Sequence, residues 1–517
     1  MKIKNNNENN YDKRVANLFD NYDHLGNVYP YYIKDKNKKF NISFKEVIKK
    51  LPEEKRKIDP TAIMEFISKT YLLNNRTLIK DIKCTPWMAK PLNNSWNYAN
   101  IPDHNETIMS VKDIVEKLKR SLKQEALSYI ADKKTIGILL SGGLDSRITA
   151  GIIKELQISG DFSGNVVSLN WGLKNSRDVC YAKEISRRYN WEYLHFDNDL
   201  EQLKQNIKIA GKDLGAQISG IHLHAMPKIR GMKNIDAIVA GSYGDSVGRA
   251  EFSGKHVTNL ESIIPNKFYL FNRFGLIKDK IIKDYVIKVQ HDAYAYRNHI
   301  NRAKDYQYKE IEQEMHYMRR KLQLCMSYIN EEIPVYQLFT DPNVFSIMWN
   351  LNPNIRNNDI YINLLKKLPK KIGEIPWART GKVLGQNKIK DNKLSSNHKY
   401  GYWLRNDLGK YISDLVLSNN ILSLNIFNEK SLKNLINLWQ KNKKYDSNIV
   451  DEIISWMASL SIFIEEYGIK SDVFVEKNYK DTLNSLWGKN YAWLYHTKPD
   501  FYKKIINFLG KHIKFFK

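Results

Sequence analysis

The chain has 517 residues, of which 42% are hydrophobic and 12% are aromatic. This length favours two or three domains, and this composition excludes a chain that is disordered throughout. The formal net charge is +26, but lysine and asparagine are spread along the whole chain, without an arginine-rich block or an aromatic RNA-binding motif. The charge alone therefore predicts no nucleic-acid partner.

The cysteines and the apolar runs indicate the compartment. Cys84, Cys180 and Cys325 are far apart and form no CxxC pair, so neither a disulfide framework nor a zinc site is expected. Residues 1–8 lack the apolar core of a signal peptide. The longest apolar run, 453–464, is shorter than the ~20 residues that cross a bilayer, and it predicts a buried helix. We therefore expect a cytoplasmic protein.

Strands and helices alternate in the middle of the chain. Before residue 110 short β-like runs mix with polar turns, and from 111 to 127 apolar residues at helical spacing predict an amphipathic helix. Short apolar runs after this helix predict buried strands at 136–140, 165–170, 193–196 and 235–240, with helical patterns between them. This alternation predicts an α/β fold with a parallel, doubly wound sheet. After about residue 255 the chain is expected to be mostly helical, ending in a basic, aromatic segment.

A glycine-rich loop lies between the first of these strands and the next helix. It consists of Ser141, Gly142, Gly143, Leu144, Asp145 and Ser146. Two glycines let backbone N–H groups approach an anion, and the N-terminus of the following helix favours negative charge at the same place. A carboxylate in such a loop is explained if Asp145 holds a Mg²⁺ ion that bridges phosphates. A serine-glycine turn that only caps the helix is the structural alternative.

The loop at 141–146 differs from the common nucleotide-binding motifs. The lysine of a Walker A loop is absent, and no GxGxxG pattern follows a strand. The string from Ile138 to Ser146 resembles the pyrophosphate loop (PP-loop) of ATP-pyrophosphatase domains, in the form found in asparagine synthetases. Further likeness extends over about residues 55–470. The resemblance implies that the loop binds ATP and that backbone near Leu139, Leu144, Leu169 and Ala240 also contacts the nucleotide.

A second loop follows the strand at 235–240. It pairs Gly241 and Gly244 with the carboxylate of Asp245, and it resembles the family's second nucleotide loop. Asp145 and Asp245 together are predicted to hold one or two Mg²⁺ ions. A Gly-Asp turn with a solvated carboxylate is the alternative interpretation.

The chain departs from the family at three places. Glutamine-hydrolysing members carry a cysteine directly after the initiator methionine, but Lys2 stands here. Ser242 and Ser246 occupy positions where the family usually has glutamate. The segment that best matches the family's lysine motif, 358–363, contains no lysine. A fixed cation stabilises the charge that develops on phosphate, and Arg379 and Lys382 are the candidates for that role, with a solvated basic loop as the alternative.

These features predict three parts: a truncated amidotransferase-like region at 1–110, a synthetase domain at 111–470 and a basic tail at 471–517. The expected reaction is ATP-dependent activation of a carboxylate, by default aspartate, with release of pyrophosphate and transfer to ammonia or an amine. A separate glutaminase is a conceivable source of ammonia. A nucleotide-binding protein without ligase activity and a PP-loop tRNA-modifying enzyme are the alternatives.

Two features of the sequence each allow two interpretations. His222 and His224 have the spacing of a metal pair but no third ligand at a suitable spacing, so a place beside the nucleotide is the preferred interpretation. The tail contains Leu486, Trp487 and Trp493 among lysines. It either packs on the core, which is the preferred interpretation, or lies on an anionic membrane surface.

Overall fold

A parallel sheet of five strands, in the order β12-β9-β6-β7-β8, is the centre of the structure. The computed structural model describes residues 13–27, 29–35, 38–264, 271–386, 393–442, 446–476 and 478–498. The strands are β6 (Thr135–Leu139), β7 (Asn165–Trp171), β8 (Glu192–Phe196), β9 (Ala237–Ala240) and β12 (Val335–Gln337). The predicted α/β class, the parallel sheet and the four expected strands are confirmed, and β12 is an additional edge strand.

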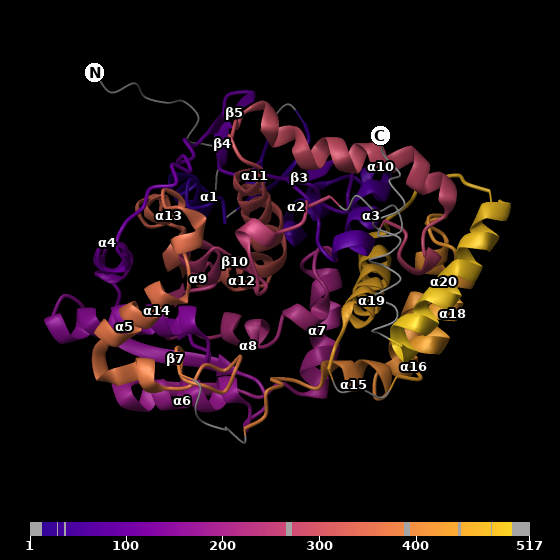
Figure 1. The fold of residues 1–517 in the computed structure, drawn as a ribbon. Helices are drawn as coiled ribbons and strands as arrows, with labels where there is room; N and C mark the ends of the chain where they lie inside the picture. Colours follow the sequence, from indigo (N-terminus) through magenta and orange to yellow (C-terminus); the bar gives the residue numbers. More distant parts are fainter. Residues whose placement is uncertain are drawn as a thin grey trace.

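Helices cover both faces of this sheet (Figure 1). Successive side chains of a strand point to opposite faces, so Ile136 and Ile138 pack in one hydrophobic cluster while Leu139 packs in the other. The first cluster includes α4 (Val111–Ile130), α5 (Leu144–Ser159), α6 (Arg177–Tyr189), α13 (Pro342–Trp349) and α14 (Asn358–Lys367). The second includes α7 (Leu200–Lys212), α8 (Met226–Arg230), α12 (Gln323–Asn330) and α19 (Ile449–Tyr467). The sheet is therefore doubly wound.

Polar side chains fix where these helices begin. Ser110 caps α4 by accepting a hydrogen bond from the backbone N–H of Asp113. Ser176 caps α6 in the same way. At α19, Asn448 and Asp451 form a reciprocal capping box. Each cap satisfies N–H groups that have no partner within the helix, which is worth about 1 kcal/mol.

The N-terminal region packs on the second face rather than apart from it. Its elements are α1 (Lys13–Asp20), β1 (Tyr31–Ile33), β2 (Phe40–Asn41), α2 (Phe44–Lys50), α3 (Pro60–Lys69), β3 (Ile82–Cys84), β4 (Ala89–Leu92) and β5 (Ser95–Tyr98). Phe66 of α3 stacks on Trp456 of α19 with ring centroids 4.1 Å apart. Residues of α2, α3 and α19 belong to one hydrophobic cluster. The boundary near residue 110 stays a prediction.

The second half of the described chain is mostly helical, as expected. After the short hairpin β10 (Glu251–Phe252) and β11 (Lys255–His256) come α10 (Asp279–Tyr294), α11 (Asp305–Glu312), α15 (Tyr400–Arg405), α16 (Gly409–Val416), α17 (Asn419–Leu422), α18 (Glu429–Trp439) and α20 (Tyr479–Thr497). Figure 1 shows α18 and α20 together at one side of the molecule. No described helix has the length and apolarity of a membrane-spanning segment. Of the predicted tail, residues 477 and 499–517 lie outside the described residues.

Candidate active site at the carboxyl edge of the sheet

The first loop joins β6 to α5, in the predicted strand–loop–helix context. Ser146 Oγ accepts a hydrogen bond from the Ser141 backbone N–H at 3.1 Å. Ser141 Oγ accepts one from the Gly143 N–H, also at 3.1 Å. The Gly142 N–H donates to Asp178 Oδ1 at 3.0 Å. The two serines therefore fix the shape of the loop, and a carboxylate oxygen already lies on one of its N–H groups.

The second loop joins β9 to the short helix α9 (Gly244–Arg249) and touches the first. A Cβ atom on Gly244 would lie 2.6 Å from Asp145 Cβ. A Cβ atom on Gly241 would lie 2.8 Å from the Asp145 carbonyl oxygen. Both distances are shorter than van der Waals contact, so any side chain at these positions would push the loops apart. Strands β6 and β9 are neighbours and parallel, so their carboxyl ends bring both loops to one edge of the sheet.

Asp145 and Asp245 meet at this contact, with a buried arginine beside them. Arg249 forms an ion pair with Asp245, and its Nη2 lies 3.2 Å from Glu251 Oε2. Asp145 Oδ1 is buried and accepts no hydrogen bond from the described residues. Burial raises the pKa of Asp145 well above its usual range, and the neighbouring Asp245 raises it further, while Arg249 opposes both. The uncharged form of Asp145 is therefore favoured in this structure.

This pair of carboxylates fits a hard divalent cation. Mg²⁺ is held in proteins by one or two carboxylates together with water and phosphate oxygens. No described residue donates a hydrogen bond to the buried Oδ1 of Asp145, although the Tyr361 hydroxyl lies beside this carboxyl group, and the Asp245 side chain is 34% exposed. Asp145 and Asp245 are thus the residues that would hold the ion.

Comparisons with known proteins find similarity among solved structures alone. No protein-family model matches the chain, and a search of curated proteins gives no match. Among solved structures, the U34-tRNA thiolase NcsA from Methanococcus maripaludis with its [4Fe-4S] cluster is similar over 53% of this chain and 79% of its own, with 12% sequence identity and a TM-score of 0.22. These values assign no reaction to this chain.

The segment that contains Arg379 and Lys382 lies against the first loop. The Ala378 N–H donates to the Gly142 carbonyl oxygen at 3.1 Å, and a Cβ atom on Gly142 would lie 2.8 Å from Ala378 Cβ. Arg379 Nη1 lies 3.4 Å from Glu251 Oε2. Arg379 therefore borders the acidic group through Glu251. Lys382 is exposed, and no contact of its ammonium with either aspartate occurs among the described residues.

The apolar residues predicted to contact the nucleotide lie in the core. The side chains of Leu139, Leu144, Leu169 and Ala240 are buried. The Leu169 carbonyl oxygen accepts a hydrogen bond from the Leu140 N–H at 2.9 Å. These residues shape the strand ends, so contact with a ligand would have to come through backbone atoms.

Aromatic rings gather where β7 ends. Trp171, the last residue of β7, stacks at 6.1 Å on His224, which in turn stacks at 5.6 Å on Tyr400. His222 is instead bound to Glu452, with its Nε2 2.7 Å from Oε1. In the part of the chain that the structure describes, the two histidines share no metal-ligand cluster. Burial lowers the pKa of His224 well below its usual range, so this ring is neutral near pH 7.

Several residues at the site escaped the sequence analysis. Arg249 follows Asp245 by four residues, a helical spacing that suits an ion pair, so a signal for it was present. Tyr361 donates to the Gly244 carbonyl oxygen at 2.6 Å, and Asn358 Oδ1 accepts from Arg249 Nη1 at 2.6 Å. Both residues lie in the segment 358–363, where the sequence drew attention only to the missing lysine. Glu251 had no signal, because its contact with Arg379 joins segments that are distant in the chain.

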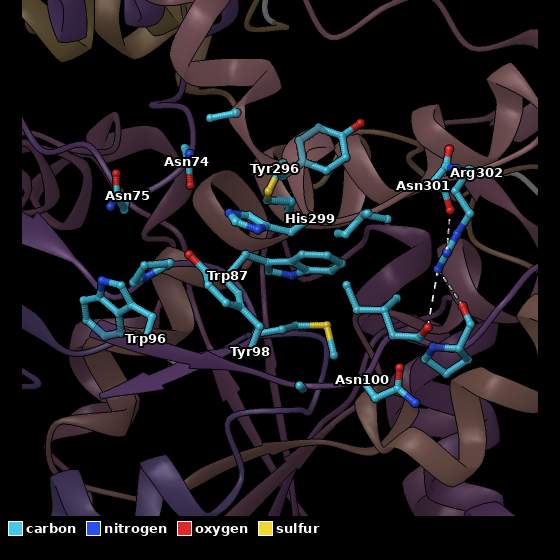
Figure 2. Close-up of a pocket in the computed structure, with 18 of the residues that line it drawn as sticks. Asn74, Asn75, Trp87, Trp96, Tyr98, Asn100, Tyr296, His299, Asn301 and Arg302 are labelled. Atoms are coloured by element: carbon cyan, nitrogen blue, oxygen red, sulfur yellow. Dashed lines mark hydrogen bonds between the residues drawn. The ribbon is translucent and has the colours of Figure 1, made fainter. Parts of the chain in front are cut away.

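A separate cavity of about 470 Å³ lies between the N-terminal region and the residues that follow α10. Figure 2 shows the rings of Trp96, Tyr98 and His299 around it, with Asn74 and Asn75 at one side. None of its lining residues belongs to the two loops. It is therefore not the site of the chemistry described above.

Proposed function

We propose that this protein is an ATP-dependent enzyme that adenylates a carboxylate and transfers the acyl group to ammonia or an amine. The observation that carries this proposal is the contact between the two loops, which joins Asp145 and Asp245 at the N-terminus of α5. A helix N-terminus, a glycine-rich loop and paired carboxylates at the carboxyl edge of a parallel sheet suit Mg²⁺-bound phosphates.

The residues of the first loop have defined parts in this reaction. The N–H groups of Gly142 and Gly143, which donate to Asp178 and Ser141 in this structure, would exchange these bonds for the β- and γ-phosphates, together with the hydroxyls of Ser141 and Ser146. The substrate carboxylate oxygen attacks the α-phosphorus, the bond to the bridging oxygen breaks, and pyrophosphate leaves. The amine then attacks the acyl carbon, AMP leaves, and the amine loses a proton. Bound Mg²⁺ would supply electrostatic stabilisation of the phosphate charge.

Arginine takes the place that lysine has in the resembling family. Arg249 is 1% exposed and fixed by Asp245, Glu251 and Asn358, so it is a preorganised cation beside the phosphates. Arg379, bound to the same Glu251, adds a second positive charge at the rim. Trp171, a half-buried ring at the end of β7, would offer an aromatic face for the adenine base.

The substrates of this proposal follow from the resemblance. Aspartate is the default carboxylate and ammonia the default nitrogen donor. A separate glutaminase is the ammonia-supplying partner in this proposal.

A second candidate is a nucleotide-binding protein without turnover. The observation that favours it is the ion pair of Arg249 with Asp245, because it occupies a carboxylate that the reaction needs for Mg²⁺. Ser242 also favours this non-catalytic candidate. Its N–H donates to Gln337 Oε1 at 3.0 Å, and its side chain carries no carboxylate.

Pyrophosphate release tests these candidates directly. The full chain is incubated with Mg·ATP, ammonium and a panel of carboxylates beginning with aspartate, and pyrophosphate is measured. The matched variants are Asp145→Asn at the site and Asp132→Asn, whose side chain is 76% exposed before β6. Carboxylate-dependent release that falls at least about 100-fold in Asp145→Asn and is unchanged in Asp132→Asn supports the ligase.

The remaining outcomes identify the alternatives. ATP binding that Asp145→Asn weakens, without pyrophosphate release for any carboxylate, would leave the non-catalytic candidate. Release that depends on added tRNA instead of a small carboxylate would identify a tRNA-modifying enzyme.

A further inference from the structure

A second group of metal-ligating side chains lies outside the two loops, beside the edge strand β12. His24 precedes β1, Glu125 lies in α4, and Asp341 caps the N-terminus of α13. One ligand atom from each residue lies within 4.8 Å of the other two. His24 and Asp341 are 9% and 6% exposed. Three distant segments of the chain therefore meet at one buried group of donors.

The negative charge at this group has no fixed counterion. Asp23 Oδ1 lies 3.8 Å from His24 Nε2, so a third carboxylate faces the same ring. Among the described residues, no lysine or arginine forms an ion pair with Glu125 or Asp341. A buried acidic pair of this kind needs either a shared proton or a cation.

Neighbouring groups orient the donors toward one another. Tyr336 of β12 holds His24 Nδ1, with its hydroxyl oxygen 3.1 Å away, so that Nε2 faces Asp341 Oδ2 at 3.8 Å. The other oxygen of Asp341 accepts from the Asn343 N–H at 2.7 Å. Metal-binding histidines characteristically use their second ring nitrogen for a hydrogen bond that fixes the ring.

We propose that His24, Glu125 and Asp341 bind one divalent transition-metal ion of the Zn²⁺ or Mn²⁺ type, which fastens the segment before β1 to α4 and α13. One imidazole and two carboxylates suit such an ion better than Mg²⁺, which prefers an all-oxygen set. When the ion binds, the proton shared by the carboxylates is released to solvent, so the charge balance needs no other group.

The metal content of the full chain tests this proposal. Protein incubated with Zn²⁺ or Mn²⁺ and freed of excess ion by gel filtration should retain about one ion per chain. Glu125→Gln keeps the side-chain volume and a hydrogen bond to Asp341, and should weaken retention at least about tenfold. The matched control is Glu116→Gln on the same helix, whose side chain is 49% exposed and which should change nothing.

Two further measurements separate this site from the nucleotide site and from a simple proton-sharing pair. Asp145→Asn should retain the ion, and a chelator should lower the unfolding temperature of the unmodified chain but not of Glu125→Gln. Equal metal content in Glu125→Gln and the unmodified chain would overturn the proposal. So would an unmodified chain that binds no ion while Glu125→Gln unfolds at the same or a higher temperature.

Helix α20 exposes a stripe of large apolar side chains, while Tyr491 and Tyr495 pack against the core. Its inward face has Asp481, Ser485, Gly488 and Ala492, all of them buried. The outward face has large apolar residues spaced three and four apart, which places them on one stripe. They are Tyr479, Leu483, Leu486, Trp487 and Trp493, with exposures of 70%, 50%, 50%, 66% and 45%. The helix therefore packs on the core with one face and presents an apolar stripe to solvent with the other.

Lysines border this outward stripe. At 100° per residue, Lys480 and Lys498 fall on one side of it and Lys489 on the other. The one carboxylate of α20, Asp481, faces inward and caps the helix. The sequence of 499–517 adds five lysines and one aspartate. Tryptophan, tyrosine and leucine flanked by lysine are the composition of helices that lie in a membrane interface.

We infer that the outward face of α20 binds the surface of an anionic lipid bilayer. The full chain should co-sediment with vesicles of phosphatidylcholine and phosphatidylglycerol, and much less with phosphatidylcholine alone. The double variant Leu483→Glu/Trp487→Glu should lose this binding, while Ile287→Glu, a 69% exposed position on α10, should keep it. A concentration-dependent dimer that the double variant abolishes, without vesicle binding, would overturn the inference in favour of a second copy of the chain.

Discussion

Asp145 lies in surroundings that disfavour its charge, and this has a measurable cost in stability. Burial and then Asp245 raise its pKa, so the folded chain holds a proton that the unfolded chain releases above the usual carboxyl pKa. Stability therefore falls as pH rises from about 4 toward the folded pKa. Asp145→Asn, neutral at every pH, should stabilise the ligand-free protein at pH 8 by about 1 kcal/mol or more, with a smaller gain at pH 5. Urea unfolding at both pH values measures this gain.

The comparison variant for this experiment is Asp132→Asn, because the Asp132 carboxylate is 76% exposed. This variant should have a free energy of unfolding within about 0.5 kcal/mol of that of the unmodified chain. A gain in Asp145→Asn that does not change between pH 5 and pH 8 would contradict a protonated Asp145.

Gly244, the first residue of helix α9, is the point where the second loop contacts Asp145 of the first loop. Alanine at Gly244 would put its Cβ 2.6 Å from Asp145 Cβ, so the loops must separate. We expect Gly244→Ala to lower the free energy of unfolding by about 1–3 kcal/mol and to weaken ATP binding, measured by calorimetry. Gly231→Ala, whose Cβ would meet nothing closer than 3.5 Å, should leave ATP binding intact. Equal ATP affinity in both variants would show that the loop contact does not shape the site.

Most of the central elements could be predicted, because their signals are local. The strands at 136–140 and 165–170 are apolar runs between polar turns, and the glycine loop follows the first of them directly. Strand β12 was missed because Val335–Gln337 has three residues, too few for a pattern, and because it joins the sheet only through its pairing with β9. Arg249 was missed for a related reason: its contacts with Asn358 and with the ring of Trp377 form only in the fold.

The whole molecule is held together by contacts between segments far apart in the chain. Arg76, 5% exposed at its side chain, binds Glu65 of α3 through Nε at 2.9 Å and also pairs with Asp292 of α10. Its Nη1 lies 2.6 Å from Asp59, the cap of α3. The N-terminal region and the helical half therefore share one buried arginine, which makes the region before residue 110 part of the scaffold of the sheet.

Removing this arginine should affect the entire structure rather than one region. Arg76→Met keeps much of the side-chain volume but leaves Asp59 and Glu65 buried without their cation, which costs about 3–5 kcal/mol. The comparison is Lys80→Met, whose ammonium pairs with Asp472 at a site where both side chains are at least a third exposed and which should cost less than about 1 kcal/mol. If the N-terminal region is part of the scaffold, tryptophan fluorescence and far-ultraviolet circular dichroism of Arg76→Met should report one shared, earlier transition in urea. An early transition confined to a fraction of the signal, with the rest unfolding like the unmodified chain, would instead mean that this region is a separate unit resting on the core around the parallel sheet.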